Sequence, residues 1–322
     1  MVTIKEMAQE LGVSTTTVSN VIHGKTKEVS PANIERIQKI LKKYDYTPNI
    51  NARNLASKRS KIIGLLIRAK QNKGANRFED PFIGGILGAI ERHVRQKGYY
   101  LMVYSVNDVH QVQQFTMSWN MDGLITSGFV EGDIRYLKER FKNPIAIIDD
   151  YDTNGLGNCV NIRIEDEQAE YLLTKYVISC GHRKLAFLAD NLVNLDKMRF
   201  QGFCRALKEA NIPVSKEENF IQIYASDAGE PQNMDEIYEK SFSYTALLCA
   251  SDYYAVHIEN MLLDRGRKIP EEISIAGFDD VPISRIVRPA LTTVRQDIQA
   301  KGIAAVEELL KLIEGESEDK IV

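Results

Sequence analysis

The stretch VSTTTVSNVIHGK, residues 13–25, has the apolar spacing of an amphipathic helix, although most of its residues are poor helix formers. Val13, Val18, Val21 and Ile22 recur at helical spacing, and threonine, serine and asparagine fill the positions between them. Such a helix has little intrinsic stability, so packing of its apolar face against neighbouring helices must hold it. Its outward-facing hydroxyl and amide groups are not needed for this packing and are available for binding.

The sequence around this stretch divides residues 3–45 into three short helices, expected at about 4–11, 15–22 and 31–44. Thr3 and Glu6 have the spacing of a capping box, Gly12 permits a tight turn, and Ser30 followed by proline starts the third helix. Two helices joined through a glycine-containing turn and followed by a third form a helix-turn-helix domain. We expect this domain at 1–47, followed by a linker at 48–60 whose short helical pattern is unstable by itself.

From residue 61 onward, short apolar runs alternate with longer amphipathic segments. The expected strands are 62–67, 100–104, 122–126, 144–149, 184–188, 219–224, 246–251 and 273–278. The expected helices are 83–97, 109–119, 133–141, 165–180, 197–211, 252–265 and 297–313. This alternation predicts right-handed βαβ units around parallel sheets.

These units are more than one sheet commonly takes, so we expect residues 61–322 to form two α/β lobes. The first lobe is expected at about 61–160 with a crossover near 290–295, and the second at about 161–322. A small ligand would lie between the lobes, at the carboxyl ends of the strands.

Charge is distributed unevenly along the chain. Residues 1–61 contain 11 basic and 5 acidic residues, a net charge of +6, which leaves 30 basic and 39 acidic residues, a net charge of −9, in the remainder. A basic N-terminal segment in an otherwise acidic chain suggests that this segment binds an anionic partner. On charge alone, a solvated positive face is an equally good interpretation.

Several function classes are disfavoured by the sequence. The N-terminus MVTIKEMAQEL lacks a signal-peptide pattern, and the longest apolar runs are far too short to span a bilayer. The four cysteines are far apart and the five histidines form no ligand-spaced cluster, so we expect neither disulfides nor a metal site. The sequence therefore predicts a cytoplasmic protein with no cofactor and no membrane partner.

Two pairs of adjacent aspartates, Asp149–Asp150 and Asp279–Asp280, raise the possibility of an enzyme. Adjacent residues of a strand point to opposite faces, so neither pair is a natural catalytic dyad. The glycines of GGILG at 84–88 lack the lysine and the spacing of a phosphate-binding loop. We therefore expect no catalytic activity; the alternative is an enzyme that retains a DNA-binding head.

The second helix of a helix-turn-helix enters the DNA major groove with its N-terminal residues at the base edges. The hydroxyl groups of Ser14 and the following threonines suit phosphates or bases, and Asn20, one turn further on, suits adenine. The alternative is a helical hairpin that binds another protein.

Longer stretches resemble one family. TIKEMAQELGVSTTTVSNVIHGK and VSPANIERIQKILKKYDYTPNINARNLASKRSKIIGLL closely resemble the LacI/GalR (lactose-repressor) family of bacterial transcription regulators. The resemblance continues through DPFIGGILGAIERHVRQKGYYLMVYS, MDGLITSG, GHRKLAFL, MRFQGFCRAL, ALLCASDYYAV and ISIAGFDDVPISRIVRPALTTVRQD, over nearly the whole chain. It implies an all-α helix-turn-helix domain followed by a two-lobed, periplasmic-binding-protein-like effector domain.

The resemblance also implies DNA-binding roles. Base contacts would come from Thr15, Thr16 and Asn20, and phosphate contacts from Thr3, Ser14 and Ser19. The linker would become a hinge helix on DNA, with Arg53 also at the DNA and Leu55 wedged into the central base step. Many members carry arginine where this chain has Asn20, so its operator is expected to depart from the usual one at that base pair.

For the effector, the resemblance implies Phe82, Asp149, Arg199, Ser251 and Asp279. The guanidinium fork of Arg199 suits paired sugar hydroxyls or a carboxylate, and Asp279 matches the family's hydroxyl-binding aspartate. Ser251 stands where asparagine is common. The alternatives are a structural ion pair between Arg199 and Asp279 and, for Arg77, a solvated charge rather than a ligand contact.

The expected function is a repressor of a sugar-utilisation operon that binds palindromic double-stranded operator DNA and responds to a small-molecule effector, a carbohydrate. Since no leucine heptads follow ELLKLIEGESEDKIV, the tetramerising tail of some relatives is absent and a homodimer is implied. Two alternatives stay open, namely a catabolite-control-type regulator governed by a protein partner and a nucleobase-responsive repressor.

Overall fold

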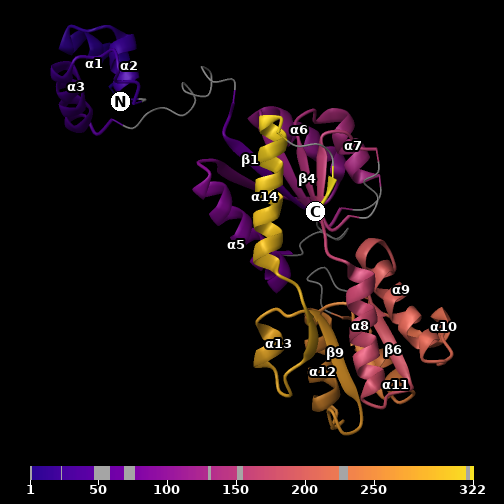
Figure 1. Cartoon of the computed structure of the whole chain (residues 1–322). Helices are drawn as coiled ribbons and strands as arrows, with labels where there is room; N and C mark the ends of the chain where they lie inside the picture. Colours follow the sequence, from indigo (N-terminus) through magenta and orange to yellow (C-terminus); the bar gives the residue numbers. More distant parts are fainter. Residues whose placement is uncertain are drawn as a thin grey trace. The chain divides into compact units, whose positions relative to one another are not determined.

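The computed structural model describes residues 2–22, 24–46, 59–68, 77–129, 132–150, 155–224, 231–316 and 320–322. The chain divides into two compact units, Met1–Ser60 and Lys61–Val322, and each is described by itself (Figure 1). The predicted hinge helix, with Arg53 and Leu55, lies outside the described residues.

The first unit contains the three predicted helices, α1 (Ile4–Leu11), α2 (Thr15–Ile22) and α3 (Pro31–Lys43). Thr3 and Glu6 form the predicted capping box, in which the Glu6 N–H donates to Thr3 Oγ1 at 3.2 Å and the Thr3 N–H donates to Glu6 Oε2 at 2.8 Å. Gly12 ends α1 in the left-handed region, at φ +67°, where glycine carries no steric penalty. These local signals make the turn between α1 and α2.

Packing holds α2 in place despite its composition. Val18 and Val21 are buried in one core with Ala8 of α1 and Ile37 of α3, together with Val29 from the connecting loop. Because the apolar face supplies the stability, the opposite face of α2 can consist of threonine and serine.

The second unit contains two parallel sheets, each covered by helices on both faces. The first sheet has the strand order β11-β5-β4-β3-β1-β2. Its strands are β1 (Ile62–Arg68), β2 (Tyr100–Val106), β3 (Gly123–Ser127), β4 (Ile145–Ile148), β5 (Cys159–Ile162) and β11 (Lys320–Ile321). The helical segments of this lobe are η1 (Arg77–Glu79), α5 (Pro81–Gln96), η2 (Val109–Gln111), α6 (Val112–Trp119), α7 (Asp133–Arg140) and α14 (Ile298–Glu314).

The second sheet has the strand order β10-β9-β8-β6-β7, again parallel throughout. Its strands are β6 (Leu185–Ala189), β7 (Phe220–Gln222), β8 (Ala246–Cys249), β9 (Ser274–Asp279) and β10 (Thr292–Arg295). Its helices are α8 (Asp166–Ser179), α9 (Asn194–Glu209), α10 (Lys216–Asn219), α11 (Met234–Ser241), α12 (Asp252–Asp264) and α13 (Ile283–Ile286).

All eight predicted strands are present, but sequence reasoning missed β5, β10 and β11. Each has four residues or fewer, β5 is interrupted by an asparagine, and β10 has only one apolar residue, so no apolar run indicates them. It also missed α10, α11 and α13, of which α10 and α13 have only four residues each.

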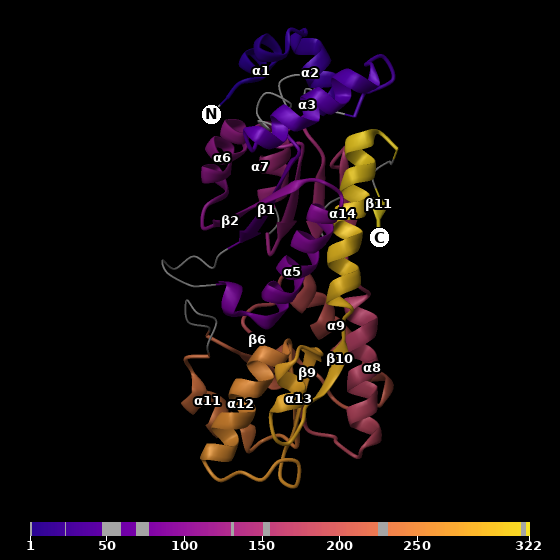
Figure 2. The same ribbon diagram turned by 90° about the vertical axis from the view of Figure 1, so that its left-hand side faces the viewer.

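The predicted lobe boundaries are wrong at the C-terminal end. Residues from α14 onward were assigned to the second lobe, whereas α14 packs against α5 and β11 pairs with β5 in the first sheet (Figure 2). The chain returns to the first lobe after Arg295, because β10 still belongs to the second sheet. The physical reason is that Ala305, Val306 and Leu309 of α14 complete the core of the first sheet.

Helices α8 and α9 cross closely at a glycine. A Cβ on Gly202 of α9 would fall well inside contact distance of the Glu167 carbonyl oxygen on α8. We predict that Gly202→Ala destabilises the protein by about 1–3 kcal/mol, because backbone atoms of α8 must move to admit the methyl group. Urea unfolding measures the change.

Gly88→Ala is the matched control for this substitution. Gly88 lies in α5 with nothing within 4 Å of an added Cβ, so alanine there should stabilise the protein by about 0.5–1 kcal/mol. Equal effects of the two substitutions would show that the close α8–α9 crossing is not required.

Candidate functional site

The first candidate site is the exposed face of α2. Ser14, Thr15 and Thr16 are exposed, while Val18 and Val21 point into the core. The structure therefore presents three of the residues predicted to contact DNA at the N-terminal end of one helix, the end that enters the major groove in helix-turn-helix proteins. Two others, Ser19 and Asn20, are half-buried and follow within the next turn.

Two of the predicted phosphate ligands also cap helices. Thr3 Oγ1 donates to Glu6 Oε2 at 2.9 Å, and Ser14 Oγ accepts from the Thr17 N–H at 3.0 Å. These bonds fix both hydroxyls at helix N-termini, where unpaired backbone N–H groups and the helix dipole favour an anion. A phosphate at α2 would therefore meet an oriented hydroxyl, whereas at α1 the Thr3 hydroxyl already donates its proton to Glu6.

An ion pair and hydrogen bonds connect α3 and the residue after it to α1. The Lys43 ammonium and the Tyr44 hydroxyl both donate to the Glu10 carboxylate, at 2.8 and 2.7 Å. These two hydrogen bonds hold the pKa of Glu10 below its usual range. The Arg36 guanidinium donates to the Leu11 carbonyl at 2.9 Å, so α3 also holds the end of α1 that leads into the turn.

The second candidate site is a buried polar cluster at the carboxyl ends of strands from both sheets. Arg199 of α9 is 4% exposed; its Nε donates to Asp166 Oδ1 at 2.8 Å and its NH1 to the Ala250 carbonyl at 2.5 Å. Its guanidinium lies 3.6 Å from the ring centre of Phe278. Arg199 therefore pairs with Asp166, which the sequence reasoning missed, and not with Asp279 as the alternative interpretation supposed.

Asp279 ends β9 with φ at +117°, an unusual backbone conformation for a residue other than glycine. Its carboxylate accepts from Gln296 Nε2 at 2.5 Å. Burial raises its pKa well above the usual value, and Arg199 opposes that rise. Asp279 is thus a buried carboxylate whose hydrogen-bond donor here is an uncharged amide.

Asp149 follows β4 with φ at +61°, in the left-handed region that aspartate and asparagine tolerate better than most residues. Both of its oxygens accept from the Lys301 ammonium, at 2.7 and 2.9 Å, and the same ammonium donates to Gln296 Oε1 at 2.7 Å. Burial raises the pKa of Asp149, while Lys301 opposes the rise. Hydrogen bonds therefore run from Asp149 through Lys301 and Gln296 to Asp279.

The sequence carried a signal for Lys301 that was missed. In the predicted helix 297–313, Lys301 shares one face with Ala305 and Leu309, and a lysine among buried apolar positions requires an acidic partner. Gln296 carried no comparable signal, because it lies in the connection after β10.

The remaining predicted effector residues have different surroundings. The ring centre of Phe82 lies 5.6 Å from the Lys301 ammonium, so Phe82 belongs to the cluster. Ser251 caps α12, with its hydroxyl accepting from the Tyr254 N–H at 3.3 Å. The Ser251 hydroxyl therefore already stabilises the N-terminus of α12. The side chain of Arg77 is not described.

The two carboxylates of the Asp279–Asp280 pair have different surroundings. Asp280 pairs with Arg285 at 2.5 Å, and its pKa is lowered by that hydrogen bond, whereas burial raises the pKa of Asp279. Among the described residues, no group of three or more His, Cys, Asp or Glu is placed to hold a metal ion. No helix within the described ranges is long and apolar enough to cross a bilayer.

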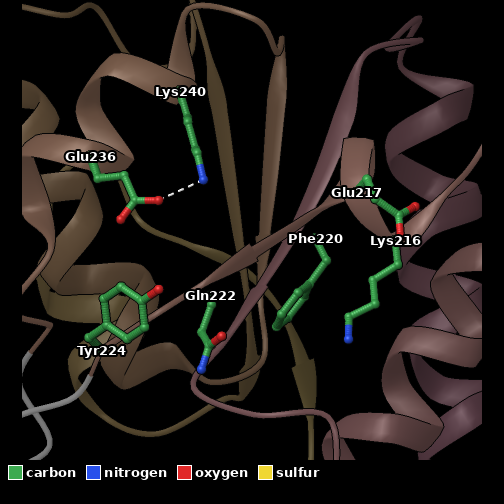
Figure 3. Close-up of a pocket in the computed structure, with 7 residues that line it drawn as sticks. All are labelled: Lys216, Glu217, Phe220, Gln222, Tyr224, Glu236 and Lys240. Carbon is green, nitrogen blue, oxygen red and sulfur yellow. Dashed lines mark hydrogen bonds and ion pairs between the residues drawn. The ribbon is translucent and has the colours of Figure 1, made fainter.

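A surface groove of about 280 Å³ lies beside β7, at the opposite edge of the second sheet from β10 (Figure 3). It is lined by Lys216, Glu217, Phe220, Gln222, Tyr224, Glu236 and Lys240. The Asn233 side chain covers the adjoining strand edge by donating to the Gln222 carbonyl and accepting from the Tyr224 N–H, both at 2.9 Å. The groove is separate from the buried cluster.

Comparisons with known proteins match both parts of the chain. Residues 3–49 match the family model "Bacterial regulatory proteins, lacI family", and residues 174–321 match "Periplasmic binding protein-like domain". The PurR repressor of Vibrio atlanticus is 31% identical, over all of this chain and 95% of that protein. The ribose operon repressor of Haemophilus influenzae is 30% identical, over 99% of this chain and 94% of that protein.

The chain belongs to the lacI family of bacterial regulatory proteins. A solved structure of the Lac repressor dimer bound to operator and an anti-inducer is similar over the whole chain and 96% of that one, with a TM-score of 0.84 and 25% identity. The resemblance inferred from the sequence is confirmed. The family consists of DNA-binding transcriptional regulators and not of enzymes, and this chain is such a regulator.

The pairing of Arg199 in this lacI-family regulator predicts the outcome of mutating it. Arg199→Met should destabilise the protein by about 3–5 kcal/mol, because it leaves the buried Asp166 carboxylate without its cation. Urea unfolding of Arg199→Met and of Arg199→Met with Asp166→Asn tests this. The double variant should recover most of the loss, and a double variant as unstable as the single would contradict the pairing.

Proposed function

We propose that this lacI-family regulator is a homodimeric repressor of a sugar-utilisation operon that acts in the cytoplasm. It would bind a palindromic operator through α2 and a carbohydrate effector between its lobes. The observation that carries the effector proposal is the buried cluster of Asp149, Arg199 and Asp279, which lies at the carboxyl ends of parallel strands. Carboxylates and a guanidinium on one side and an aromatic ring on another suit a molecule with many hydroxyls.

On the DNA side, the proposal assigns roles on the operator. Thr15, Thr16 and Asn20 would read bases, and Thr3, Ser14 and Ser19 would hold phosphates. The exposed threonines and the helix-capping hydroxyls support this assignment. Arg53 and Leu55 are proposed to contact the DNA from the linker at 48–60.

Regulation requires two states of the effector domain. An effector that binds one lobe arrangement more tightly than the other shifts the population toward it, by no more than this difference in affinity. A linker that is marginally stable as a helix can respond to that shift, because pairing of two linkers in a dimer would stabilise them on DNA. The exposed apolar side chains of Tyr100 and Val103 on the edge strand β2 support a dimer.

A nucleobase-responsive repressor is the second candidate. The PurR repressor of Vibrio atlanticus and the ribose operon repressor are equally similar to this chain, at 31% and 30% identity, so identity alone does not choose between them. A thermal-shift screen of neutral sugars, sugar phosphates and nucleobases separates the two candidates. Binding of a neutral sugar that also alters an operator footprint supports the proposal, and binding of nucleobases alone overturns its carbohydrate part.

Control by a protein partner is a third outcome of the same screen. If none of the three small-molecule classes changes the melting temperature or the operator footprint, a small-molecule effector of these classes is contradicted. Addition of a phosphocarrier protein to the footprinting assay then tests the catabolite-control alternative directly.

Substitution of Asn20 tests the proposed contact between α2 and the operator bases. Asn20→Arg should move the preference at one symmetric base pair of each half-site from adenine to guanine, since asparagine suits adenine and arginine suits guanine. Asn20→Ala should lose about 1–3 kcal/mol of discrimination at that position only. Selection of binding sites from randomised palindromes measures both effects.

Gln9→Ala is the matched control, because Gln9 is an exposed amide on α1, outside the proposed reading helix. It should leave the selected sequence unchanged. If Asn20→Arg leaves the half-site preference unchanged while the protein still binds DNA, the proposed role of Asn20 is wrong.

A further inference from the structure

We propose that the ion pair between Lys301 and Asp149 is a charge filter, which restricts the effector to uncharged molecules and excludes phosphate esters and carboxylates. Lys301 is then a specificity-determining residue. The inference rests on the proposed function, in that it takes the buried cluster to be the effector site, and it narrows the class of molecule that this site accepts.

The ammonium of Lys301 is already held by acceptors of the protein. An ammonium carries three N–H groups, and the three short contacts from Nζ lead to the two carboxylate oxygens of Asp149 and to Gln296 Oε1. The Lys301 side chain is 4% exposed and that of Asp149 is 9% exposed, so water does not substitute freely for either partner. An anion that approaches Lys301 therefore has to compete with the Asp149 carboxylate for the ammonium.

Displacement of Asp149 from Lys301 by an anion would cost free energy. The released Asp149 carboxylate would stay buried without its cation, and burial already raises its pKa. The incoming anion would also share the cluster with the Asp279 and Asp166 carboxylates. Asp166 is paired with Arg199, and the hydrogen bond from Gln296 gives Asp279 no positive charge. The cluster therefore holds three acidic side chains, Asp149, Asp166 and Asp279, beside two basic ones, Arg199 and Lys301.

An uncharged hydroxyl compound meets no such penalty. Each carboxylate oxygen accepts more than one hydrogen bond, so sugar hydroxyls can donate to Asp149 and Asp279 while the ion pair stays intact. The Phe82 ring beside the ammonium offers an apolar face for the carbon skeleton of the same molecule. The cluster therefore combines free acceptor capacity with a Lys301 ammonium that is already paired.

The backbone holds the two partners in place. Lys301 is in the first turn of α14, next to Gly302, where a Cβ would collide with Ala89 of α5, so α14 lies directly against that helix. Asp149 is at the end of β4 with a left-handed backbone conformation, which fixes the direction of its side chain. Neither partner can withdraw by a simple rotation of a surface side chain.

The decisive experiment removes the charge of Asp149 and offers inorganic phosphate. Asp149→Asn keeps the size of the side chain, and asparagine tolerates the positive φ; Asp149→Gly is a second variant that also tolerates it. With the ammonium released, we expect phosphate and D-ribose 5-phosphate to bind the full-length variant at least about tenfold more tightly than wild type, measured by isothermal titration calorimetry.

Two double variants test whether the gain in phosphate affinity of Asp149→Asn depends on Lys301. Asp149→Asn with Lys301→Met should lose it, because the cation is gone. Asp149→Asn with Lys311→Met should keep it, because Lys311 lies on the same helix with a half-exposed side chain and pairs with Glu308, outside the cluster. Circular dichroism and urea unfolding establish that each variant is folded.

Several results would overturn the filter. One is tight binding of phosphate or ribose 5-phosphate to wild type; another is a folded Asp149→Asn and a folded Asp149→Gly that both gain nothing. A gain that survives Lys301→Met would place the anion elsewhere on the protein. If the filter behaves as expected but no neutral sugar binds wild type, the filter stands and the carbohydrate assignment of the proposed function falls.

Discussion

A charge removed from water needs a partner of opposite sign, and the region between the two sheets is organised around that requirement. Arg199 is held by Asp166 and by a backbone carbonyl, and Lys301 is held by both oxygens of Asp149. Gln296 connects the second pair to Asp279 at the end of β9. Lys301 of α14 and the aspartates after β4 and at the end of β9 are thereby fixed in one network, and Arg199 of α9 and Asp166 of α8 form a separate ion pair.

Under the proposed function, this network would couple effector binding to the arrangement of the lobes. Asp149 and Lys301 belong to elements of the first sheet, Asp279 to the second, and Gln296 to the connection between them. A ligand that forms hydrogen bonds with Asp279 or Gln296 competes with contacts that join the lobes, so its binding free energy depends on their relative position. The same polar contacts that satisfy buried charge therefore provide the differential affinity that an effector-controlled regulator needs.

The helix-turn-helix unit depends on packing for the stability of its second helix. Helix α2 is built from threonine, serine and valine, and the packing of Val18 and Val21 replaces the stability that its composition lacks. Ser14 and Thr3 cap their helices, which orients both hydroxyls at helix N-termini. Stability and polar recognition are thus assigned to opposite faces of a single short helix.

The sequence by itself determined the family, the three N-terminal helices with their caps, and the eight longer strands. Each of these depends on residues close together in the chain: a capping box, a glycine turn, or a run of apolar residues. Asp149, Arg199 and Asp279 were predicted because the stretches that contain them resemble the lacI family, and the structure brings them into one cluster.

Only the tertiary structure decided the partners of those residues and the lobe to which the C-terminal helix belongs. Two- to four-residue strands such as β5, β10 and β11 exist because neighbouring strands offer them hydrogen bonds, and no local pattern encodes them. Asp149 and Lys301 are 152 positions apart, and Arg199 and Asp166 are 33 apart. The choice of a counter-ion depends on which groups folding buries together, and that is a property of the packed chain and not of any segment of it.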